Sequence, residues 1–214
     1  MSREGASRLP RLLLIADGFV TGRPELEAVA IRERAVALVE AGVPWVGLRD
    51  HNAGDDAFLE VAGPLVRDLR SIRPDVVLTV HGRLRAALVL EAGLHVGWRG
   101  ASLQTALEAG VRFAGVSAHS ATGARRAAKA GARYATFSPV FETRTHPDAV
   151  PTGIDPLRLA ASRAGIPVLA LGGMTPPRAR IARLVGAHGA AAISSLLFAW
   201  DEARTVGQFL DAVA

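Results

Sequence analysis

The sequence predicts an α/β protein, a single (β/α)8 TIM barrel, because one helix–strand unit is repeated along the chain. Each unit is an amphipathic segment followed by a short apolar run. Five junctions carry an Ala-Gly pair: Ala41-Gly42, Ala92-Gly93, Ala109-Gly110, Ala130-Gly131 and Ala164-Gly165. Glycine directly after a helix ends it at low cost, since this position needs a positive φ. The apolar run that follows is typical of a strand buried on both faces.

We expect eight strands and eight helices in strict alternation. The strands are expected at the apolar runs, residues 11–17, 45–50, 76–80, 94–97, 112–118, 134–140, 167–173 and 190–196. The helices are expected at the amphipathic segments, residues 25–40, 55–72, 83–91, 102–107, 122–129, 156–163, 177–185 and 201–213. Unbroken alternation with short connections favours a closed parallel barrel over a doubly wound open sheet. No linker or low-complexity segment interrupts residues 1–214, so we expect one domain.

Composition excludes several classes of chemistry. The 214 residues are 50% hydrophobic and 21% charged, as in ordinary globular proteins. Because there is no cysteine, disulfides, thiolate nucleophiles and Cys-ligated metals are excluded. The single lysine, Lys129, lies in a polar helical stretch, which disfavours Schiff-base chemistry.

The net charge of +5 favours a small anionic ligand over nucleic acid. The arginines are scattered among acidic residues and aromatic residues make up only 5%, so neither a phosphate-backbone footprint nor a stacking platform is expected. The apolar run 12–16 stops at Asp17, too short for a signal sequence or a membrane span. We therefore expect a cytoplasmic protein without a nucleic-acid or membrane partner; a homo-oligomer is left open.

Five of the six histidines lie at or near the carboxyl ends of the expected strands, where barrels carry their active sites. They are His51, His81, His95, His119 and His146. His95, between two apolar residues, fits a hydrogen-bonded interior residue as well as a ligand, and the sixth, His188, is expected to face solvent. No carboxylate-rich spacing or H-x-x-x-H pair accompanies them, so no metal site is predicted.

A phosphate site is predicted where the seventh and eighth strands end. Gly172 and Gly173 allow backbone N–H groups to approach an anion, and Ile193 and Ser194 stand at the end of the next strand. Barrels often bind phosphate between these two loops, near a helix N-terminus. Two such elements on the two expected strands favour a phosphate cradle over a simple tight turn.

Three segments resemble the thiamine phosphate synthase superfamily. They are Gly115-Val116-Ser117-Ala118-His119-Ser120, Pro139-Val140-Phe141-Glu142-Thr143, and Pro167 through Leu171-Gly172-Gly173-Met174-Thr175-Pro176. The resemblance extends over nearly the whole chain. It implies a barrel that acts in thiamine biosynthesis, either as a thiamine phosphate synthase or as a thiazole tautomerase of the TenI-like branch.

The resemblance also implies roles for residues at the strand ends. In the synthases a Gln-x-Arg-x-Lys pattern ends the second strand and contacts the pyrimidine and its pyrophosphate; here the matching residues are Gly47, Arg49 and His51. A Thr-x-Thr-Lys pattern follows the sixth strand, and here it is Thr143, Thr145 and His146. These side chains, with Ser117 and His81, are expected to bind substrate, Arg49 through a carboxylate.

The Mg²⁺ ligands of the synthases are missing at the matching positions. The family carries an aspartate after the third strand and another after the fourth, and here these positions are Gly82 and Gly100. Mg²⁺ needs oxygen ligands, commonly carboxylates. On this ground we expect a metal-independent, cofactor-free thiazole tautomerase, an isomerase that binds a thiazole phosphate and uses His119 as acid and base. Two alternatives stay open: a thiamine phosphate synthase, which would need Mg²⁺, and a non-catalytic phosphate-binding or regulatory relative.

Overall fold

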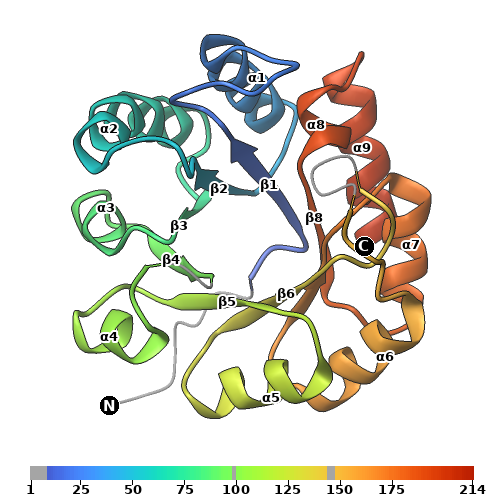
Figure 1. Cartoon of the computed structure of the whole chain (residues 1–214). Coiled ribbons are helices and arrows are strands. Elements are labelled where there is room, and N and C mark those ends of the chain that lie inside the picture. Colours follow the sequence, from blue (N-terminus) through green and yellow to red (C-terminus); the bar gives the residue numbers. More distant parts are fainter. Residues whose placement is uncertain (1–8, 98–99, 144–147) are drawn as a thin grey trace.

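A computed structural model describes residues 9–97, 100–143 and 148–214 and shows a closed (β/α)8 TIM barrel (Figure 1). Within these ranges all eight strands are parallel and pair in chain order, with β8 closing on β1. The strands are β1 (Leu12–Asp17), β2 (Trp45–Arg49), β3 (Val77–His81), β4 (Gly93–Val96), β5 (Ala114–Ala118), β6 (Tyr134–Phe137), β7 (Val168–Ala170) and β8 (Gly189–Ala192). The predicted fold class is confirmed.

Helices surround the barrel and cover the outer face of the strands (Figure 1). They are α1 (Ala28–Glu40), α2 (Asp55–Ile72), α3 (Leu84–Val89), α4 (Leu103–Glu108), α5 (Ala121–Lys129), α6 (Ile154–Arg163), α7 (Pro176–Leu184), α8 (Ser194–Leu197) and α9 (Glu202–Val213). Among the described residues, no helix is long and apolar enough to cross a membrane.

The strands are buried on both faces, as their unbroken apolar runs predict. Leu12 to Ile15 of β1 are fully buried, and Trp45 and Tyr134 fill the barrel interior with their rings 4.7 Å apart in an edge-to-face arrangement. Such contacts add to the stabilisation that area burial alone provides.

The Ala-Gly junctions end helices as predicted, with one exception. Gly42, Gly110, Gly131 and Gly165 have positive φ angles between 77° and 114°. Gly93 instead lies inside β4, and the Phe113 ring occupies the space of its missing side chain, 2.5 Å from where a Cβ would stand. At this junction Glu91 takes the left-handed conformation, with φ of 48°.

Three strand ends fall clearly short of the sequence-based expectation, and the first is that of β6, which stops at Phe137 instead of residue 140. The seventh strand stops at Ala170, because Gly172 and Gly173 have φ angles of 100° and 61°, outside the extended region. The eighth stops at Ala192, and the apolar segment that follows forms the short helix α8. The changes in β7 and β8 lie at the predicted phosphate site.

Candidate active site at the mouth of the barrel

The loops after β7 and β8 enclose a cavity of about 380 Å³ at the carboxyl ends of the strands. Its lining includes Gly172, Gly173, Ile193 and Ser194, the four residues of the predicted phosphate site, together with Thr143, which is expected to bind substrate. The first N–H groups of a helix lack partners within it and attract anions. Here α8 begins at Ser194 on the edge of this cavity, which we call the phosphate cradle.

Gly173 is required by close packing as well as by its backbone conformation. A Cβ at this position would clash with the carbonyl oxygen of Glu142. Arg178, at the start of α7, donates from Nη1 to the carbonyl oxygen of Gly173 over 2.6 Å, and its guanidinium lies 4.6 Å from the centre of the Phe141 ring. Sequence reasoning missed Arg178. The sequence signal that could have found it is a cationic residue about one helical turn after the Gly172-Gly173 loop.

Ser117 lies near the end of β5, His119 directly follows this strand, and both residues are exposed. The Nδ1–H of His119 donates to the carbonyl oxygen of Ser138 over 2.6 Å, since a carbonyl can only accept. In the neutral ring, Nε2 is therefore the nitrogen with the lone pair.

Below Ser117, a buried polar network fills the top of the barrel. His95 is 2% exposed, with Nδ1 hydrogen-bonded to the Tyr134 hydroxyl over 2.9 Å and Nε2 to Ser117 Oγ over 3.0 Å. Burial, together with the charge of Arg49, lowers the pKa of His95 to about 3, so this ring is neutral near pH 7. The interior alternative for His95 is the one the structure supports.

His81 lies across the mouth-facing side of Gly47. Its ring stacks on His95 with centroids 4.4 Å apart, and its Nε2 would lie 2.8 Å from a Cβ at residue 47. This Nε2 is buried and has no hydrogen-bond partner among the described residues. Burial and the neighbouring His95, Arg49 and His51 lower the pKa of His81 well below its usual value. The ring is thus a neutral group near pH 7.

Arg49 is held by an acidic neighbour. Its Nε donates to Asp17 Oδ1 over 2.6 Å, and Arg23 pairs with the other oxygen of the same carboxylate. The expected pairing of Arg49 with a substrate carboxylate would compete with this internal ion pair. His51 lies exposed in the segment after β2, and Thr145 and His146 lie outside the described residues.

The carboxylate of Asp50 is hydrogen-bonded mainly to backbone N–H groups. It accepts hydrogen bonds from the N–H groups of Val20, Thr21, Asn52 and Ala53. Burial alone would raise the pKa of Asp50, but these hydrogen bonds outweigh it and hold the pKa below its usual value. Asp50 therefore fixes the loops after β1 and β2.

The mouth does not fit the Mg²⁺ that the resemblance implies for a synthase. Gly82 and Gly100 have φ angles of 71° and 92°, and a Cβ at Gly100 would clash with the carbonyl oxygen of Gly82. Asp17 and Asp50 are occupied by the contacts above. Among the described residues, no group of three or more His, Asp or Glu side chains could hold a metal ion.

The fold and this site define a class of protein, a TIM barrel with a phosphate cradle between its last two strands. A family model described as "Thiamine monophosphate synthase" matches residues 19–196, and the chain belongs to this family.

Similar proteins carry the corresponding name. The "Thiamine-phosphate synthase" of Syntrophomonas wolfei is 37% identical over 197 residues, covering 89% of this chain and 93% of that protein. A "Putative thiamine-phosphate synthase 2" of Aquifex aeolicus is 32% identical, covering 88% and 98%. The solved structure of a thiamine phosphate pyrophosphorylase from Pyrococcus furiosus superposes with a TM-score of 0.81 at 28% identity and 95% coverage of both chains.

These comparisons correct the predicted activity. The tautomerase interpretation is wrong, because relatives between 31% and 37% identical are named thiamine-phosphate synthases and the synthase alternative fits them better. The expectation rested on the two missing aspartates and on His51 and His146, which stand where the synthases carry lysines. The role of His119 as the acid and base of a tautomerase depended on that interpretation and is no longer expected.

Proposed function

We propose that this chain is a transferase of the thiamine phosphate synthase type, which joins a hydroxymethylpyrimidine group, supplied as its pyrophosphate ester, to a thiazole phosphate. The observation that carries the proposal is the phosphate cradle, because it offers an anion site at the face where barrels carry their chemistry. The relatives' names supply the reaction.

In this reaction the thiazole nitrogen forms a bond to the exocyclic methylene carbon of the pyrimidine, and the bond from that carbon to the pyrophosphate oxygen breaks. The electron pair leaves with the pyrophosphate, and no proton needs to be removed from the thiazole nitrogen. What the protein supplies is therefore position and electrostatic stabilisation, which lower the barrier without a covalent intermediate.

The residues around the mouth have matching roles in this proposal. The cradle at Gly173 and Ser194 holds the thiazole phosphate and so places the ring at the mouth. The Ser117 hydroxyl, held by the neutral His95, is an oriented hydrogen-bonding group at the top of the barrel. The exposed residue His119 lies two residues further along the chain, directly after β5. No step is assigned to Mg²⁺, because the described residues do not fit it.

The test is a direct assay. The purified chain is incubated with the pyrimidine pyrophosphate and the thiazole phosphate, with and without Mg²⁺, and thiamine phosphate is quantified by mass spectrometry. We expect thiamine phosphate and pyrophosphate in equal amounts. Binding of the thiazole phosphate without any product under either condition would contradict the proposal and leave a phosphate-binding protein without this chemistry.

A further inference from the structure

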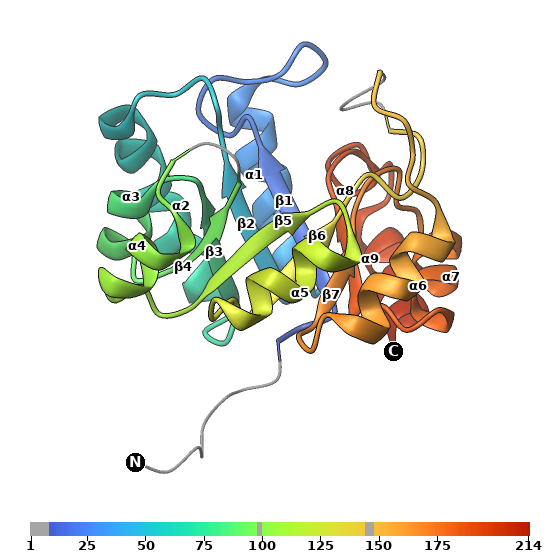
Figure 2. The same cartoon turned by 60° about the horizontal axis from the view of Figure 1, so that its bottom comes forward.

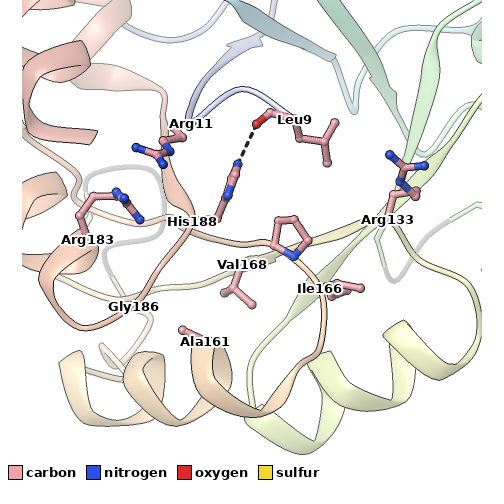
Figure 3. Close-up of a pocket in the computed structure, with 10 residues that line it drawn as sticks. Leu9, Arg11, Arg133, Ala161, Ile166, Val168, Arg183, Gly186 and His188 are labelled. Carbon is pink, nitrogen blue, oxygen red and sulfur yellow. Dashed lines mark hydrogen bonds between the residues drawn. The ribbon is translucent and has the colours of Figure 1, made fainter. Parts of the chain in front are cut away.

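A second pocket lies on the opposite face of the barrel, where the strands begin and where Figure 2 shows the C-terminus; Figure 3 shows the pocket in close-up. Its volume is about 530 Å³, within the range of small-molecule sites. The lining comes from residues just before β1, β6 and β8, from the start of β7, and from α6 and α7. We call it the lower pocket. It shares no lining residue with the phosphate cradle.

One wall of the lower pocket is apolar. It is made by Ile166, Pro167 and Val168, at the start of β7, together with Ala161 of α6 (Figure 3). Val168 is 1% exposed and anchored in the core, so this wall is rigid. Such a surface suits an apolar or aromatic body.

Three of the remaining lining residues are cationic. Arg11 and Arg183 lie on one side of His188 and Arg133 lies on the other (Figure 3). Among the described residues, no acidic side chain lines this pocket. Three guanidinium charges around one apolar wall produce a positive potential that attracts an anion.

Arg11 and Arg183 are held in place by neutral acceptors. Arg11 Nη1 donates to the carbonyl oxygen of Val213 over 3.1 Å, and Arg183 Nη1 donates to that of Ala187 over 2.6 Å. A carbonyl fixes a guanidinium without cancelling its charge. Both arginines also reach a backbone oxygen of Ala214, and even a carboxylate there would leave the pocket with a net positive charge.

The environment of His188 reflects the same positive potential. Its ring donates Nε2–H to the carbonyl oxygen of Leu9 over 2.8 Å, so it does not face bulk solvent as expected from the sequence (Figure 3). Burial, followed by the charges of Arg11 and Arg183, lowers the pKa of His188. The imidazole is therefore a neutral part of the wall near pH 7.

Arg133 is the guanidinium best placed to accept a new partner. It is exposed, and no ion pair or hydrogen bond of its side chain is found among the described residues. Its backbone is fixed, because its N–H donates to the carbonyl oxygen of Ala114 over 2.7 Å and the next residue is the buried Tyr134. An anion at Arg133 would lie beside the apolar wall.

We propose that the lower pocket binds a small molecule that combines an oxyanion, phosphate or carboxylate, with an apolar body. The oxyanion pairs with Arg133, within the field of Arg11 and Arg183, and the body lies on Ile166 and Pro167, which Val168 supports from the core. Guanidinium groups recognise both oxyanions through paired N–H donors. The site is separate from the proposed chemistry and does not depend on it.

The test uses phenyl phosphate as the probe, with benzoate, inorganic phosphate and benzyl alcohol as comparison arms. Because the phosphate cradle also attracts phosphate, binding is followed in the variant Ser194→Asp, which puts a negative charge in the cradle. We expect phenyl phosphate to shift the amide NMR signals of Ile166 and Gly186. Benzoate matching phenyl phosphate identifies a carboxylate as an equal source of the oxyanion, and weaker benzoate binding favours phosphate.

The decisive variant is Arg133→Ala, with Arg125→Ala as the control because Arg125 is an exposed arginine on α5 outside the lining. Loss of a charged hydrogen bond should weaken phenyl phosphate binding by about ten- to a hundredfold in the Arg133 variant only. Equal weakening in both variants, equal binding of benzyl alcohol, or shifts confined to the cradle would overturn the proposal. Synthase activity is not a readout here, so failure of either proposal leaves the other standing.

Discussion

Gly47 and His81 form a matched pair at the edge of the mouth. The absence of a side chain at residue 47 leaves the space that the His81 ring occupies, and this position allows the ring to stack on His95. The pair shapes the β2–β3 side of the mouth. It also leaves His81 Nε2 buried without a partner among the described residues, an arrangement that costs free energy and is typical of functional sites.

Replacing Gly47 by alanine should displace the His81 ring. The new Cβ would lie 2.8 Å from Nε2, closer than packed atoms tolerate, so we expect a loss of about 1–3 kcal/mol in the free energy of unfolding. Urea denaturation measures it. The control is Gly54→Ala, since nothing lies within 4 Å of a Cβ at that position. Relief of the cost in the double variant Gly47→Ala, His81→Ala would confirm the contact, and an equal cost in both backgrounds would contradict it.

At the scale of elements, α8 is the part of the candidate site that sequence patterning missed. Ser194-Ser195-Leu196-Leu197 follows the apolar residues of β8 without a glycine or proline, so the sequence pattern extends the predicted strand to residue 196. Four residues are too few for a helical period to be visible. The strands, the longer helices and the Gly172-Gly173 loop could be predicted, because each depends on a local apolar run or a conformational need of glycine.

Side-chain contacts between residues far apart in the sequence could not be predicted. The ion pair of Arg49 with Asp17 joins the neighbouring strands β2 and β1, and His188, just before β8, donates to Leu9, just before the neighbouring β1. Neither pair shares a local pattern. The sequence therefore located the polar residues at the two faces but not their partners.

The position of helix α8 at the cradle predicts how a substitution at Ser194 changes ligand binding. Ser194→Asp should abolish thiazole phosphate binding, because a carboxylate would occupy the place of the anion at the helix start. The fold should be retained, since an acidic residue is favourable at a helix N-terminus. Isothermal titration calorimetry measures the affinity, and Gln208→Glu, which adds a negative charge on exposed α9, serves as the control. Wild-type affinity in a folded Ser194→Asp protein would exclude the cradle as the phosphate site.

The residues that follow β3 and β4 predict that Mg²⁺ does not change the thermal stability of the fold. Because Gly82 and Gly100 leave no carboxylate there, Mg²⁺ or EDTA should leave the melting temperature unchanged, whereas a ligand of the folded state raises it. Thermal unfolding with thiazole phosphate is the positive control. A Mg²⁺-dependent increase in the melting temperature would show that other side chains form a metal site.

At the scale of the whole molecule, buried histidines make the barrel sensitive to acid. The pKa values of His81, His95 and His188 are all lowered, chiefly by burial, and that of His95 reaches about 3. In the unfolded chain these rings titrate near 6.5. Below that pH the unfolded state binds more protons than the folded state, so the stability present above pH 6.5 is lost as the pH falls towards 3.

We therefore expect the free energy of unfolding to decrease as the pH falls from about 7.5 to 4.5. This range lies above the titration of Asp50, and the buried neutral histidines set the slope of the free energy against pH. For His95 alone the full shift corresponds to a loss on the order of 5 kcal/mol by about pH 3, and roughly half of it falls within this range. Urea denaturation at several pH values measures the slope. His95→Gln keeps a hydrogen-bonding side chain but cannot titrate, so it should be less stable near neutrality and show a flatter dependence on pH. A slope that is unchanged in this variant would mean that His95 is not the source of the acid sensitivity, whereas a constant stability in the wild-type chain would contradict neutral burial of all three rings.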